Sequence, residues 1–439
     1  MTTRTPISKL RQHVGQEVNV CGWAHAIRDH KHVQFIILRD STGQAQATLE
    51  KTSSPFLAEA VSSLTRESAV RAVGHVRENP QVRLGGIEMM LTDLVVEGPA
   101  TSPMPIDPFA GSLPGLDNRL DWRHLDLRRP ENQLLLKVQT TVVSAMRSFW
   151  ISEGFQEIHT SKLMGTASES GAELFEVDYF GSAAYLAQSP QFYKQMAIAS
   201  GFERVFEIAP VFRADPSFTT RHTTEFTSVD VEMAWIDSHE DVMVFEERWL
   251  SYVLEAVAQE HGAQIADAFA VEVVPPVAPF PRIPFADAIV QISQDGREAH
   301  VRATDLDSQG ERSLGAWIQR EQGHEFVFIT DYPTSGRPFY HMRQAFDPKI
   351  TRSFDLLWKG LEITTGAQRE HRPGVLERQA HEKGLRSESI GFYLDFFRYG
   401  CPPHGGFGLG LARLLMVLLG FSNVREATLL PRAPNRLHP

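Results

Sequence analysis

The sequence predicts an α+β protein with two domains, a small β-barrel followed by a larger domain in which helices flank an antiparallel sheet. Residues 17–96 carry five short runs rich in β-branched and aromatic residues, with one helical segment among them. A stretch dense in Pro, Gly and Ser follows, and beyond it amphipathic helices alternate with apolar strands. At 439 residues with 42% hydrophobic residues, the chain is long and apolar enough to bury two or three cores.

Charge, cysteine content and hydropathy exclude several classes of protein. A formal net charge of -11 argues against a protein that simply coats nucleic acid, but it leaves room for a local basic surface. Cys21 and Cys401 are far apart and show no metal-ligand spacing, so we expect neither a disulfide nor a zinc site, and a reducing cytoplasm fits. The N-terminal MTTRTPISKL lacks an apolar signal core, and the longest apolar run, residues 414–419, is too short to span a bilayer. We therefore expect no membrane role.

The barrel prediction rests on the order of its elements. The helical segment, residues 53–67, stands between the third and fourth β-rich runs. That is the order of an OB-fold, a small barrel that often binds single-stranded nucleic acid. On such a barrel Arg28 could contact a phosphate and Phe35 could stack on a base. Ordinary packing within the barrel is an equal alternative for Phe35.

The stretch PATSPMPIDPFAGSLPG, residues 99–115, predicts a semi-rigid connector. We therefore expect a first domain over residues 1–103, a hinge over 104–125 and a second domain over 126–439. In the second domain the patterns first predict a helix from Pro130, a strand over 155–163, a loop over 166–173, a helix after Pro190 and a hairpin over 205–235. Helices over about 238–260 and within 284–292 and 305–321 follow, and then strands over 326–333 and 361–366. The chain ends with a helix over about 375–383 and, after a glycine-rich lead-in, an apolar C-terminal helix.

The hairpin over residues 205–235 is the centre of the functional prediction. Its loop carries Arg213, Arg221 and His222. A guanidinium is a rigid fork of donors that suits phosphate or carboxylate oxygens, although each arginine alone could equally pair with acids at the surface. The second strand alternates four apolar residues, Val229, Val231, Met233 and Trp235, with two acids, Asp230 and Glu232. This alternation predicts one buried face and one polar face.

Two further segments could bind a nucleotide. GGFGLGLAR, residues 405–413, matches neither a dinucleotide fingerprint nor a P-loop, but glycines before a helix let a ligand approach the backbone, and the helix N-terminus attracts anions. Arg413 would then face a phosphate, with a surface cation as the alternative. Glu362, with the hydroxyls of Thr364 and Thr365, could form part of a Mg²⁺ shell completed by water and substrate phosphates. Otherwise Glu362 is an acid on the surface of a strand.

Together these segments resemble the signatures of class II aminoacyl-tRNA synthetases. FQEIHTSKL (155–163) resembles the first signature, FRADPSFTTRHTTEF (212–226) the second and GGFGLGLARLL (405–415) the third. Two further segments are similar to segments of the archaeal type of aspartyl-tRNA synthetase. They are SPQFYKQ (189–195) and the QREH that follows the EITTG strand. The resemblance covers essentially the whole chain. It implies that the barrel is an anticodon-binding domain and that the second domain is the class II catalytic domain.

The resemblance also implies a role for each matching residue. ATP would be held by Arg213 at the α-phosphate, by Arg221 and Arg413 at the terminal phosphates, by Phe226 at the adenine, and by Asp215, His222 and Glu362. Arg213 and Arg413 would be the catalytic residues. The substrate aspartate would be held at its ammonium group by Glu169, Ser189, Gln191 and Asp230, and at its side chain by Lys194 and Arg369, with Thr365 nearby. Glu362 and Thr365 would bind Mg²⁺. The anticodon would be read by Arg28, His30, Phe35, Gln46, Pro80 and Glu88.

The implied activity is ATP-dependent aminoacylation of tRNA with L-aspartate through an aspartyl-adenylate, in a cytoplasmic homodimer. Asparaginyl-tRNA synthetases usually carry an acid at the position of Lys194, so the lysine favours aspartate. Relatives with His and Pro at the positions of His30 and Pro80 tend to charge both tRNA-Asp and tRNA-Asn, which favours dual specificity over charging of tRNA-Asp alone. The segment between the second and third signatures is too short for the insertion domain of the common bacterial aspartyl enzymes.

The chain departs from the family pattern at two positions. Ser161 stands where the first signature usually has proline, in a region that forms the dimer interface in relatives, so the details of that interface stay open. Asp215 is the only candidate contact to the adenine amino group, where archaeal members tend to have two acids. Two rival functions remain. An inactive binding protein would lack Arg213, Arg413 or Glu362, and an asparagine-forming paralogue would lack the barrel.

Overall fold

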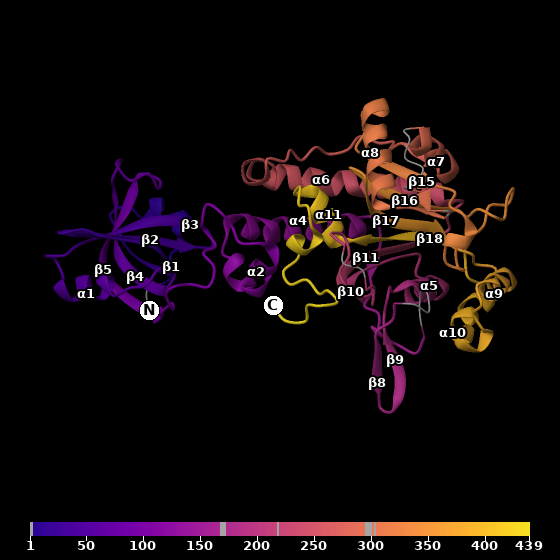
Figure 1. The fold of residues 1–439 in the computed structure, drawn as a ribbon, viewed down its shortest axis with the longest axis horizontal. Helices are drawn as coiled ribbons and strands as arrows, with labels where there is room; N and C mark the ends of the chain where they lie inside the picture. The colour runs from indigo at the N-terminus through magenta and orange to yellow at the C-terminus, as the bar shows by residue number, and fades with distance from the viewer. Residues whose placement is uncertain (1–2, 167–172, 217–218, 295–300, 303) are drawn as a thin grey trace. The chain divides into compact units, whose positions relative to one another are not determined.

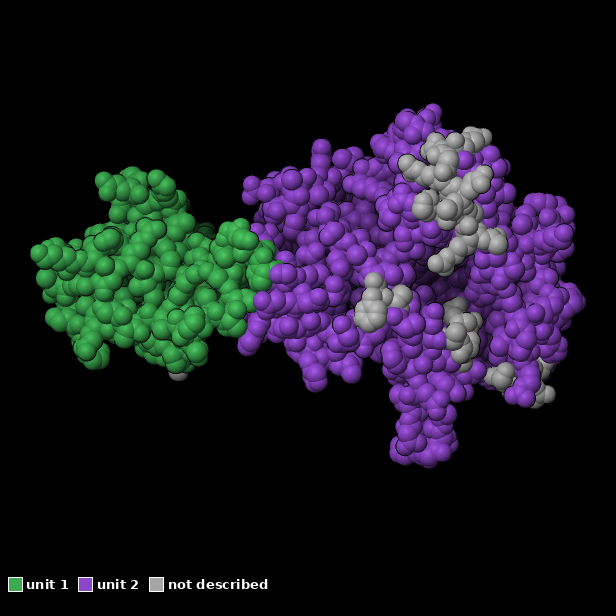
Figure 2. All heavy atoms as spheres, viewed as in Figure 1, with its two compact units in different colours: residues 1–114 green, residues 115–439 purple. Residues whose placement is uncertain are grey.

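The computed structural model describes residues 3–166, 173–216, 219–294, 301–302 and 304–439. The chain divides into two compact units, Met1–Pro114 and Gly115–Pro439, which Figure 2 shows in different colours. Each unit has a hydrophobic core of its own. None of the described helices combines the length and the apolar character that crossing a bilayer requires.

The first unit is a closed barrel with the strand order β1-β2-β3-β5-β4 (Figure 1). Its elements are the 3-10 helix η1 (Ile7–His13), β1 (Glu17–Asp29), β2 (Val33–Asp40), β3 (Gly43–Glu50), α1 (Pro55–Ser62), β4 (Ala69–Glu78) and β5 (Ile87–Gly98). The helix begins after Ser54, whose hydroxyl accepts from the backbone N–H of Leu57 at 3.3 Å. Five strands with a helix after the third are the predicted OB-fold, which is confirmed.

The second unit is built on an eight-stranded sheet with the order β12-β15-β16-β17-β18-β11-β10-β6 (Figure 1). Its strands are β6 (Gln156–Glu157), β10 (Arg204–Phe212), β11 (Glu225–Ala234), β12 (Arg282–Pro284), β15 (Phe326–Thr330), β16 (Ser353–Trp358), β17 (Leu361–Gln368) and β18 (His404–Gly410). The pairs β12–β15 and β10–β6 are parallel and the other pairs are antiparallel. Two small sheets accompany it, one of β7 (Leu163–Met164), β8 (Glu176–Tyr179) and β9 (Ser182–Leu186), and one of β13 (Val301–Arg302) and β14 (Asp305–Leu306).

Helices pack against both faces of this large sheet. The helices of the unit are α2 (Leu116–Asp121), α3 (Arg123–Asp126), α4 (Pro130–Ser152), α5 (Gln191–Ala199), α6 (His239–Phe269), α7 (Phe285–Gln294), α8 (Ser308–Gln322), α9 (Pro373–Glu382), α10 (Ser387–Arg398) and α11 (Leu411–Leu418), with the 3-10 turns η3 (Thr334–Gly336) and η4 (Val424–Ala427). The main core joins apolar side chains of α4, α6 and α11 to the alternate residues of β11, β16 and β18. The polar residues between them therefore point to the opposite face.

The predicted hairpin is confirmed. β10 and β11 pair antiparallel from Arg204 opposite Met233 to Phe212 opposite Glu225, which leaves residues 213–224 as the loop. Val229 and Val231 lie in the core, fully buried. The expectation that Trp235 joins this buried face is wrong, because β11 ends at Ala234 and Trp235 is 69% exposed. Trp235 has φ +60°, and its backbone N–H donates to the carbonyl of Pro403, so the chain turns away from the strand there.

The glycine-rich segment before the last helix is a strand, β18, and not the expected lead-in. It lies between β17 and β11 in the middle of the sheet. A Cβ on Gly406 would lie 1.9 Å from the carbonyl oxygen of Val231, which no side chain tolerates. The glycine therefore permits close approach of two strands. The helix that follows, α11, begins at Leu411 as expected.

Two element boundaries differ from the prediction, and one helix was not predicted. Only Gln156–Glu157 of the expected strand over 155–163 joins the large sheet. The helix expected to end near residue 260 continues to Phe269, because residues 261–269 contain no proline and Ile265 still packs into the core. The helix over Ser387–Arg398 was not predicted, and it packs Tyr393 and Phe397 into a separate cluster against α5.

Candidate active site

One cavity of about 690 Å³ opens on the face of the sheet opposite α4, α6 and α11. It brings together residues that are more than 200 positions apart in the sequence. Of the residues expected to bind ATP, aspartate or Mg²⁺, it is lined by Ser189, Gln191, Lys194, Arg213, Asp215, Arg221, His222, Phe226, Asp230, Glu362, Thr365, Arg369 and Arg413. Glu169, the remaining member of that set, lies outside the described residues.

Arginines from two signatures meet at one end of the cavity. Nε of Arg413, on α11, donates to the backbone carbonyl of Arg221 at 3.2 Å, and an Nη atom donates to the carbonyl of Glu362 at 3.2 Å. The Glu362 carboxylate lies 3.5 Å from the same guanidinium. The guanidinium of Arg221 donates to Glu311 of α8 at 2.5 Å. Two guanidiniums held at fixed positions are suited to bind the oxygens of a polyphosphate.

Carboxylates of this region differ in protonation. Burial acts to raise the pKa of Glu362, but Arg413 and Arg221 outweigh it, so its pKa is lowered and it stays ionised. Burial, together with repulsion from Glu362, raises the pKa of Glu311 to about 7. Glu311 also accepts from the backbone N–H of Glu362 at 3.0 Å. At neutral pH the pair therefore carries between one and two negative charges.

A second group of side chains lies along the hairpin loop. The guanidinium of Arg213 lies over the ring of Phe226, 5.5 Å from its centroid. Burial, and the positive charges of Arg413 and Arg221, lower the pKa of His222 to about 4, so its imidazole is neutral at pH 7. Thr219 makes a hydrogen bond to Nδ1 of His222 at 2.6 Å. Asp215 lines the same cavity.

The residues expected to bind Mg²⁺ fit a partial shell. The hydroxyl of Thr365 donates to Oε1 of Glu362 at 3.0 Å, and the ionised carboxylate is 30% exposed towards the cavity. No group of three or more metal-ligating side chains that could enclose an ion by itself occurs among the described residues. One carboxylate beside a hydroxyl fits an ion that takes most of its ligands from water and phosphate.

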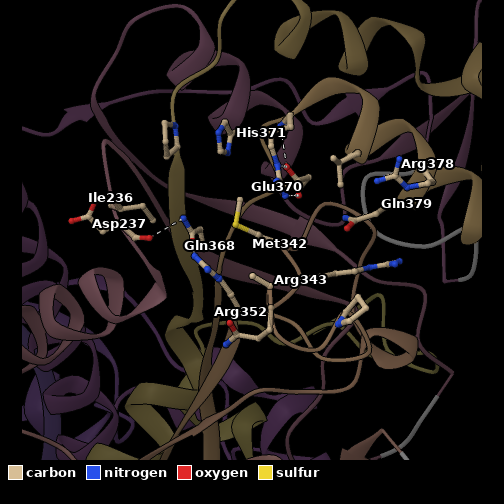
Figure 3. Close-up of a pocket in the computed structure, with 16 residues that line it drawn as sticks. Ile236, Asp237, Met342, Arg343, Arg352, Gln368, Glu370, His371, Arg378 and Gln379 are labelled. Carbon is tan, nitrogen blue, oxygen red and sulfur yellow. Dashed lines mark hydrogen bonds and ion pairs between the residues drawn. The ribbon is translucent and has the colours of Figure 1, made fainter.

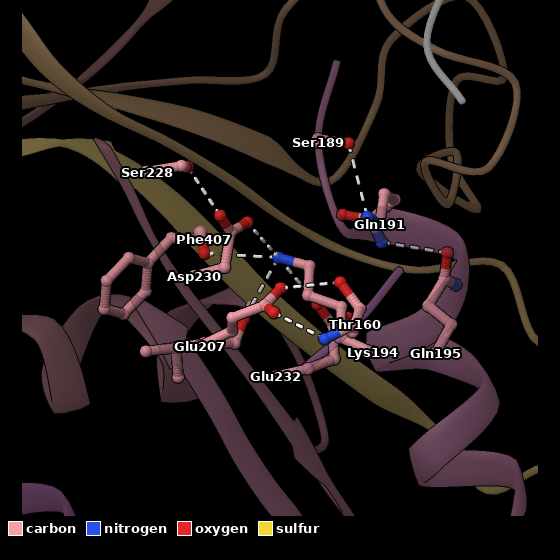
Figure 4. A network of polar contacts seen from close by, with 12 residues as sticks. Thr160, Ser189, Gln191, Lys194, Gln195, Glu207, Ser228, Asp230, Glu232 and Phe407 are labelled. Atoms are coloured by element: carbon pink, nitrogen blue, oxygen red, sulfur yellow. Dashed lines mark hydrogen bonds and ion pairs between the residues drawn. The ribbon is translucent and has the colours of Figure 1, made fainter. Parts of the chain in front are cut away.

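Lys194 lies at the other end of the cavity, on α5, and is almost fully buried (Figure 4). Its ammonium donates to Oδ1 of Asp230 at 3.1 Å and to the carbonyls of Val231 and Phe407, each at 3.3 Å. It also lies 3.2 Å from Oε2 of Glu232. The strand alternation predicted from the sequence places both acids on the face that meets Lys194.

Arg369 shares the same buried acid. Its Nε donates to Oε1 of Glu232 at 3.0 Å, and one Nη donates to the carbonyl of Gly406 at 3.0 Å. Its other Nη contacts Nε2 of His341 at 3.1 Å. Burial lowers the pKa of His341 well below its usual value, and Arg369 adds to that effect, so the imidazole is neutral and accepts this hydrogen bond. Lys194 and Arg369 thus form a rigid cationic pair.

A chain of amides holds the residues expected at the substrate ammonium. The backbone N–H of Gln191 donates to the hydroxyl of Ser189 at 3.3 Å, and its side-chain amide donates to Gln195 at 2.8 Å (Figure 4). Gln195 is fixed in turn by His404 at 2.9 Å and by the hydroxyl of Tyr393 at 2.8 Å. Asp230 accepts from the hydroxyl of Ser228 at 2.5 Å. The acceptors in this corner are therefore pre-oriented.

Sequence reasoning did not assign several residues that line this cavity or hold its side chains in place. Glu232 was recognised on the polar face of β11, but its role as counter-ion was not, and the only signal was its alternation with Asp230. Glu311 comes from α8, whose packing against β17 no local pattern reveals. The unassigned charged or titratable residues that line the cavity itself are Glu173, Asp305, Asp307, Arg337, Tyr340 and His341.

The barrel residues expected to read an anticodon share a region of the outer face. Phe35 pairs with Arg28 across β1 and β2, and its ring lies 5.9 Å from that of His30. Gln46 pairs with Glu88 across β3 and β5, and its amide donates to the Glu88 carboxylate at 3.2 Å.

Glu88 is 2% exposed and also accepts from Thr48, Arg77 and Asn79. Pro80 follows this network in an exposed loop. The ring of Phe35 is only half-buried, so it remains available to stack on a base.

Known proteins resemble the chain over its full length. Residues 115–434 match the family of class II tRNA synthetases (D, K and N), and residues 18–97 match the OB-fold nucleic acid binding domain family. The aspartate–tRNA(Asp) ligase of Thermococcus kodakarensis is 43% identical over 426 residues, which cover 97% of each chain. The aspartate–tRNA(Asp/Asn) ligase of Methanopyrus kandleri is 45% identical and covers 97% of this chain and 96% of the relative. The asparaginyl-tRNA synthetase of Pyrococcus horikoshii, complexed with asparaginyl-adenylate, covers both chains fully with a TM-score of 0.92 and 32% identity.

Proposed function

The chain belongs to the class II tRNA synthetases (D, K and N), and from that premise we propose that it attaches L-aspartate to both tRNA-Asp and tRNA-Asn in an ATP-dependent reaction. The observation that carries the choice of aspartate is the buried cationic pair of Lys194 and Arg369 in the same cavity as Arg213 and Arg413. The side-chain carboxylate of aspartate offers this pair charged acceptors in addition to Glu232, whereas the amide of asparagine offers only a neutral oxygen and an N–H group that cannot accept.

The reaction needs positioning and charge neutralisation more than it needs a protein base. Asp230, Gln191 and Ser189 hold the ammonium group of aspartate, while Lys194 and Arg369 hold its side chain. An oxygen of the α-carboxylate attacks the α-phosphorus of ATP, the bond to the bridging oxygen breaks, and pyrophosphate leaves. The guanidinium of Arg213 binds the α-phosphate, where charge accumulates, and Arg221 and Arg413 bind the departing phosphates.

The second step transfers the aspartyl group to tRNA. A terminal ribose hydroxyl of the tRNA attacks the acyl carbon of the adenylate, the acyl–phosphate bond breaks, and AMP leaves with the electron pair. Glu362 and Thr365 would hold Mg²⁺, which when bound neutralises phosphate charge. Arg28, Phe35, Gln46 and Glu88 of the barrel bind the anticodon, with Phe35 stacking on a base.

His30 and Pro80 support the wider tRNA choice. Both lie in exposed loops of the barrel, at positions where relatives with the same residues tend to accept tRNA-Asn as well as tRNA-Asp. Relatives named for tRNA-Asp alone and for both tRNAs are similarly close to the chain, at 43% and 45% identity. Sequence identity alone therefore does not decide which tRNAs the chain charges. We further propose a cytoplasmic homodimer that uses the region of the first signature, including Ser161, as its interface.

Asparaginyl-tRNA synthesis is the second candidate, because a solved asparaginyl enzyme covers the whole chain. Lys194 argues against it, since the side chain of asparagine would bring only a neutral amide to the ammonium of Lys194 and to Arg369, and its N–H groups would point at cations. Replacing a charged acceptor by a neutral one weakens such hydrogen bonds by about 1–3 kcal/mol, or roughly 10–10²-fold in selection against asparagine.

The test charges purified tRNA-Asp and tRNA-Asn separately with radiolabelled aspartate, and with asparagine as the competing amino acid. We expect aspartylation of both tRNAs and no asparaginylation of either. Failure on tRNA-Asn at high enzyme concentration would restrict the enzyme to tRNA-Asp. Failure on both tRNAs, with ATP–pyrophosphate exchange also absent for aspartate, would remove the function.

A further inference from the structure

We propose that a second cavity in the larger unit binds a small ligand that joins one phosphate group to an apolar part, as a mononucleotide does. The cavity has a volume of about 620 Å³, and it shares no lining residue with the candidate active site (Figure 3). It opens among β17, the segment after β15 and the first two turns of α9. None of the roles proposed above uses this cavity.

The lining is rich in arginine although the whole chain is acidic. Arg343, Arg352, Arg372 and Arg378 line the cavity, against the two carboxylates of Asp237 and Glu370. The chain carries a net charge of -11, so this positive surplus is local. It favours an anionic ligand over a neutral or cationic one.

Two of these arginines are already neutralised. Arg372 binds Glu370 with both arms of its fork, from Nε to Oε1 at 2.8 Å and from Nη to Oε2 at 2.7 Å. Arg343 forms an ion pair with Glu382 of α9. These two ion pairs form part of the cavity wall, and their arginines carry little uncompensated positive charge to attract a ligand.

The other two arginines supply the charge for a phosphate. Arg352 donates only to a neutral group, the side-chain oxygen of Gln368 at 2.7 Å (Figure 3). Arg378 is exposed on α9. Neither has a carboxylate partner within the part of the chain that the structure describes. Two guanidiniums without counter-ions among the described residues, both lining this cavity, suit a phosphate, whose oxygens accept several N–H donors at once.

The remaining walls fit the other parts of such a ligand. Ile236, Met342 and Val375 offer apolar surface for a base. The side-chain amide of Gln379, a residue only 2% exposed, donates to the carbonyls of Phe339 and His341, while its oxygen has no partner among the described residues. Gln379 therefore contributes a fixed, buried polar side chain to this wall.

The cavity is backed by the same backbone as the candidate active site. Gln368 and Arg369 are neighbours on an extended segment, so they point to opposite faces, the first into this cavity and the second into the site. The backbone N–H of Met342 donates to the carbonyl of Gln368 at 3.0 Å, next to His341. A ligand that fixes Gln368 and Met342 therefore acts on the segments that position Arg369 and His341.

The experiment titrates AMP into the full-length protein by calorimetry after the active site has been saturated with a non-hydrolysable aspartyl-adenylate analogue. We expect one AMP per chain, with an affinity that falls as salt is added. The Arg352→Gln, Arg378→Gln double variant should bind AMP about tenfold or more weakly. Arg320→Gln is the matched control, because Arg320 is 59% exposed on α8 and pairs with Glu321 away from the cavity, and it should bind AMP as the wild type does.

Three results would overturn the proposal. They are the absence of AMP binding to the saturated protein, equal binding of AMP and adenosine, and AMP binding that the double variant leaves unchanged. Tighter binding of a short oligoribonucleotide, lost in the same variant, would identify the occupant as RNA and remove the small-ligand reading. If the double variant unfolds, AMP binding is measured with the single variant Arg378→Gln, because Arg378 is exposed. Unchanged AMP binding in that variant would then overturn the proposal. Failure of the analogue to bind would instead count against the proposed function.

Discussion

Lys194 and Glu232 form a buried ion pair, with Nζ 3.2 Å from Oε2, and Glu232 also accepts from Nε of Arg369 at 3.0 Å. The two cations expected to bind the side chain of aspartate therefore share one counter-ion. Burial acts to raise the pKa of Glu232, but Arg369 and Lys194 lower it more, so the carboxylate stays ionised. Both cations are held in position without the substrate, which reduces the ordering that binding requires.

Replacing Lys194 by glutamine tests this arrangement. The variant keeps a similar volume but leaves Asp230 and Glu232 opposite a neutral amide, so we expect the KM for aspartate to rise by about 10²-fold or more, with little change in the KM for ATP. ATP–pyrophosphate exchange measures both constants. Lys162→Gln is the control, because Lys162 forms a comparable pair with Glu207 at 2.8 Å but does not line the cavity. An unchanged aspartate KM in the Lys194 variant would refute the assignment.

Arg213→Lys tests whether fork geometry matters at the α-phosphate. Lysine retains the positive charge but offers a single donor atom, so we expect kcat for pyrophosphate exchange to fall by about 10²–10³-fold with smaller changes in KM. Arg204→Lys is a matched control. Arg204 lies over the ring of Phe155 as Arg213 lies over that of Phe226, but it starts β10 outside the cavity. Wild-type exchange in the Arg213 variant would contradict its role.

Phe35→Ala separates tRNA binding from amino-acid activation. Loss of one stacking platform costs about 1–3 kcal/mol, so kcat/KM for tRNA should fall by about tenfold or more. Pyrophosphate exchange in the absence of tRNA should be unaffected, because Phe35 belongs to the other unit. Phe56→Ala controls for the loss of an aromatic ring from the barrel, since Phe56 is 85% exposed on α1. An equal loss of tRNA charging in both variants would argue against anticodon stacking.

The sequence predicted most of this architecture because the relevant signals are local. The barrel order, the hairpin of β10 and β11 and the start of α4 at Pro130 each follow from a short pattern of apolar, polar and turn residues. The contacts between elements that are distant in the sequence do not follow from such patterns. Glu311 reaches Arg221 only because α8 packs near β17, and no periodicity indicates that contact.

The glycines of β18 were misinterpreted for a similar reason. A glycine-rich run usually indicates a loop, whereas here Gly406 is required because β11 approaches β18 closely. The need for glycine arises from the neighbouring strand, which the local sequence does not show.

Glu246 predicts how stability depends on pH. Its side chain is fully buried on α6, one oxygen accepts from the hydroxyl of Thr364 at 2.6 Å, and the other has no partner among the described residues. Burial, together with the charges of Glu247 and Asp355, raises its pKa from 4.5 to about 8 although Thr364 opposes the shift. Between these two pH values the folded protein keeps a proton that the unfolded chain has lost. The contribution of Glu246 to stability is therefore fully present below pH 4.5 and is lost as the pH rises towards 8.

Glu246→Gln should remove this dependence, because glutamine resembles the protonated acid and never ionises. We expect the midpoint of thermal unfolding of the variant, relative to that of the wild type, to rise steadily between pH 5 and pH 8. The difference should grow by about 2–4 °C for each kcal/mol of unfolding free energy that the wild type loses through Glu246. Glu255→Gln, an exposed position on the same helix, should shift both ends of the profile equally. A constant difference between the Glu246 variant and the wild type over this range would mean that Glu246 is ionised in the folded protein.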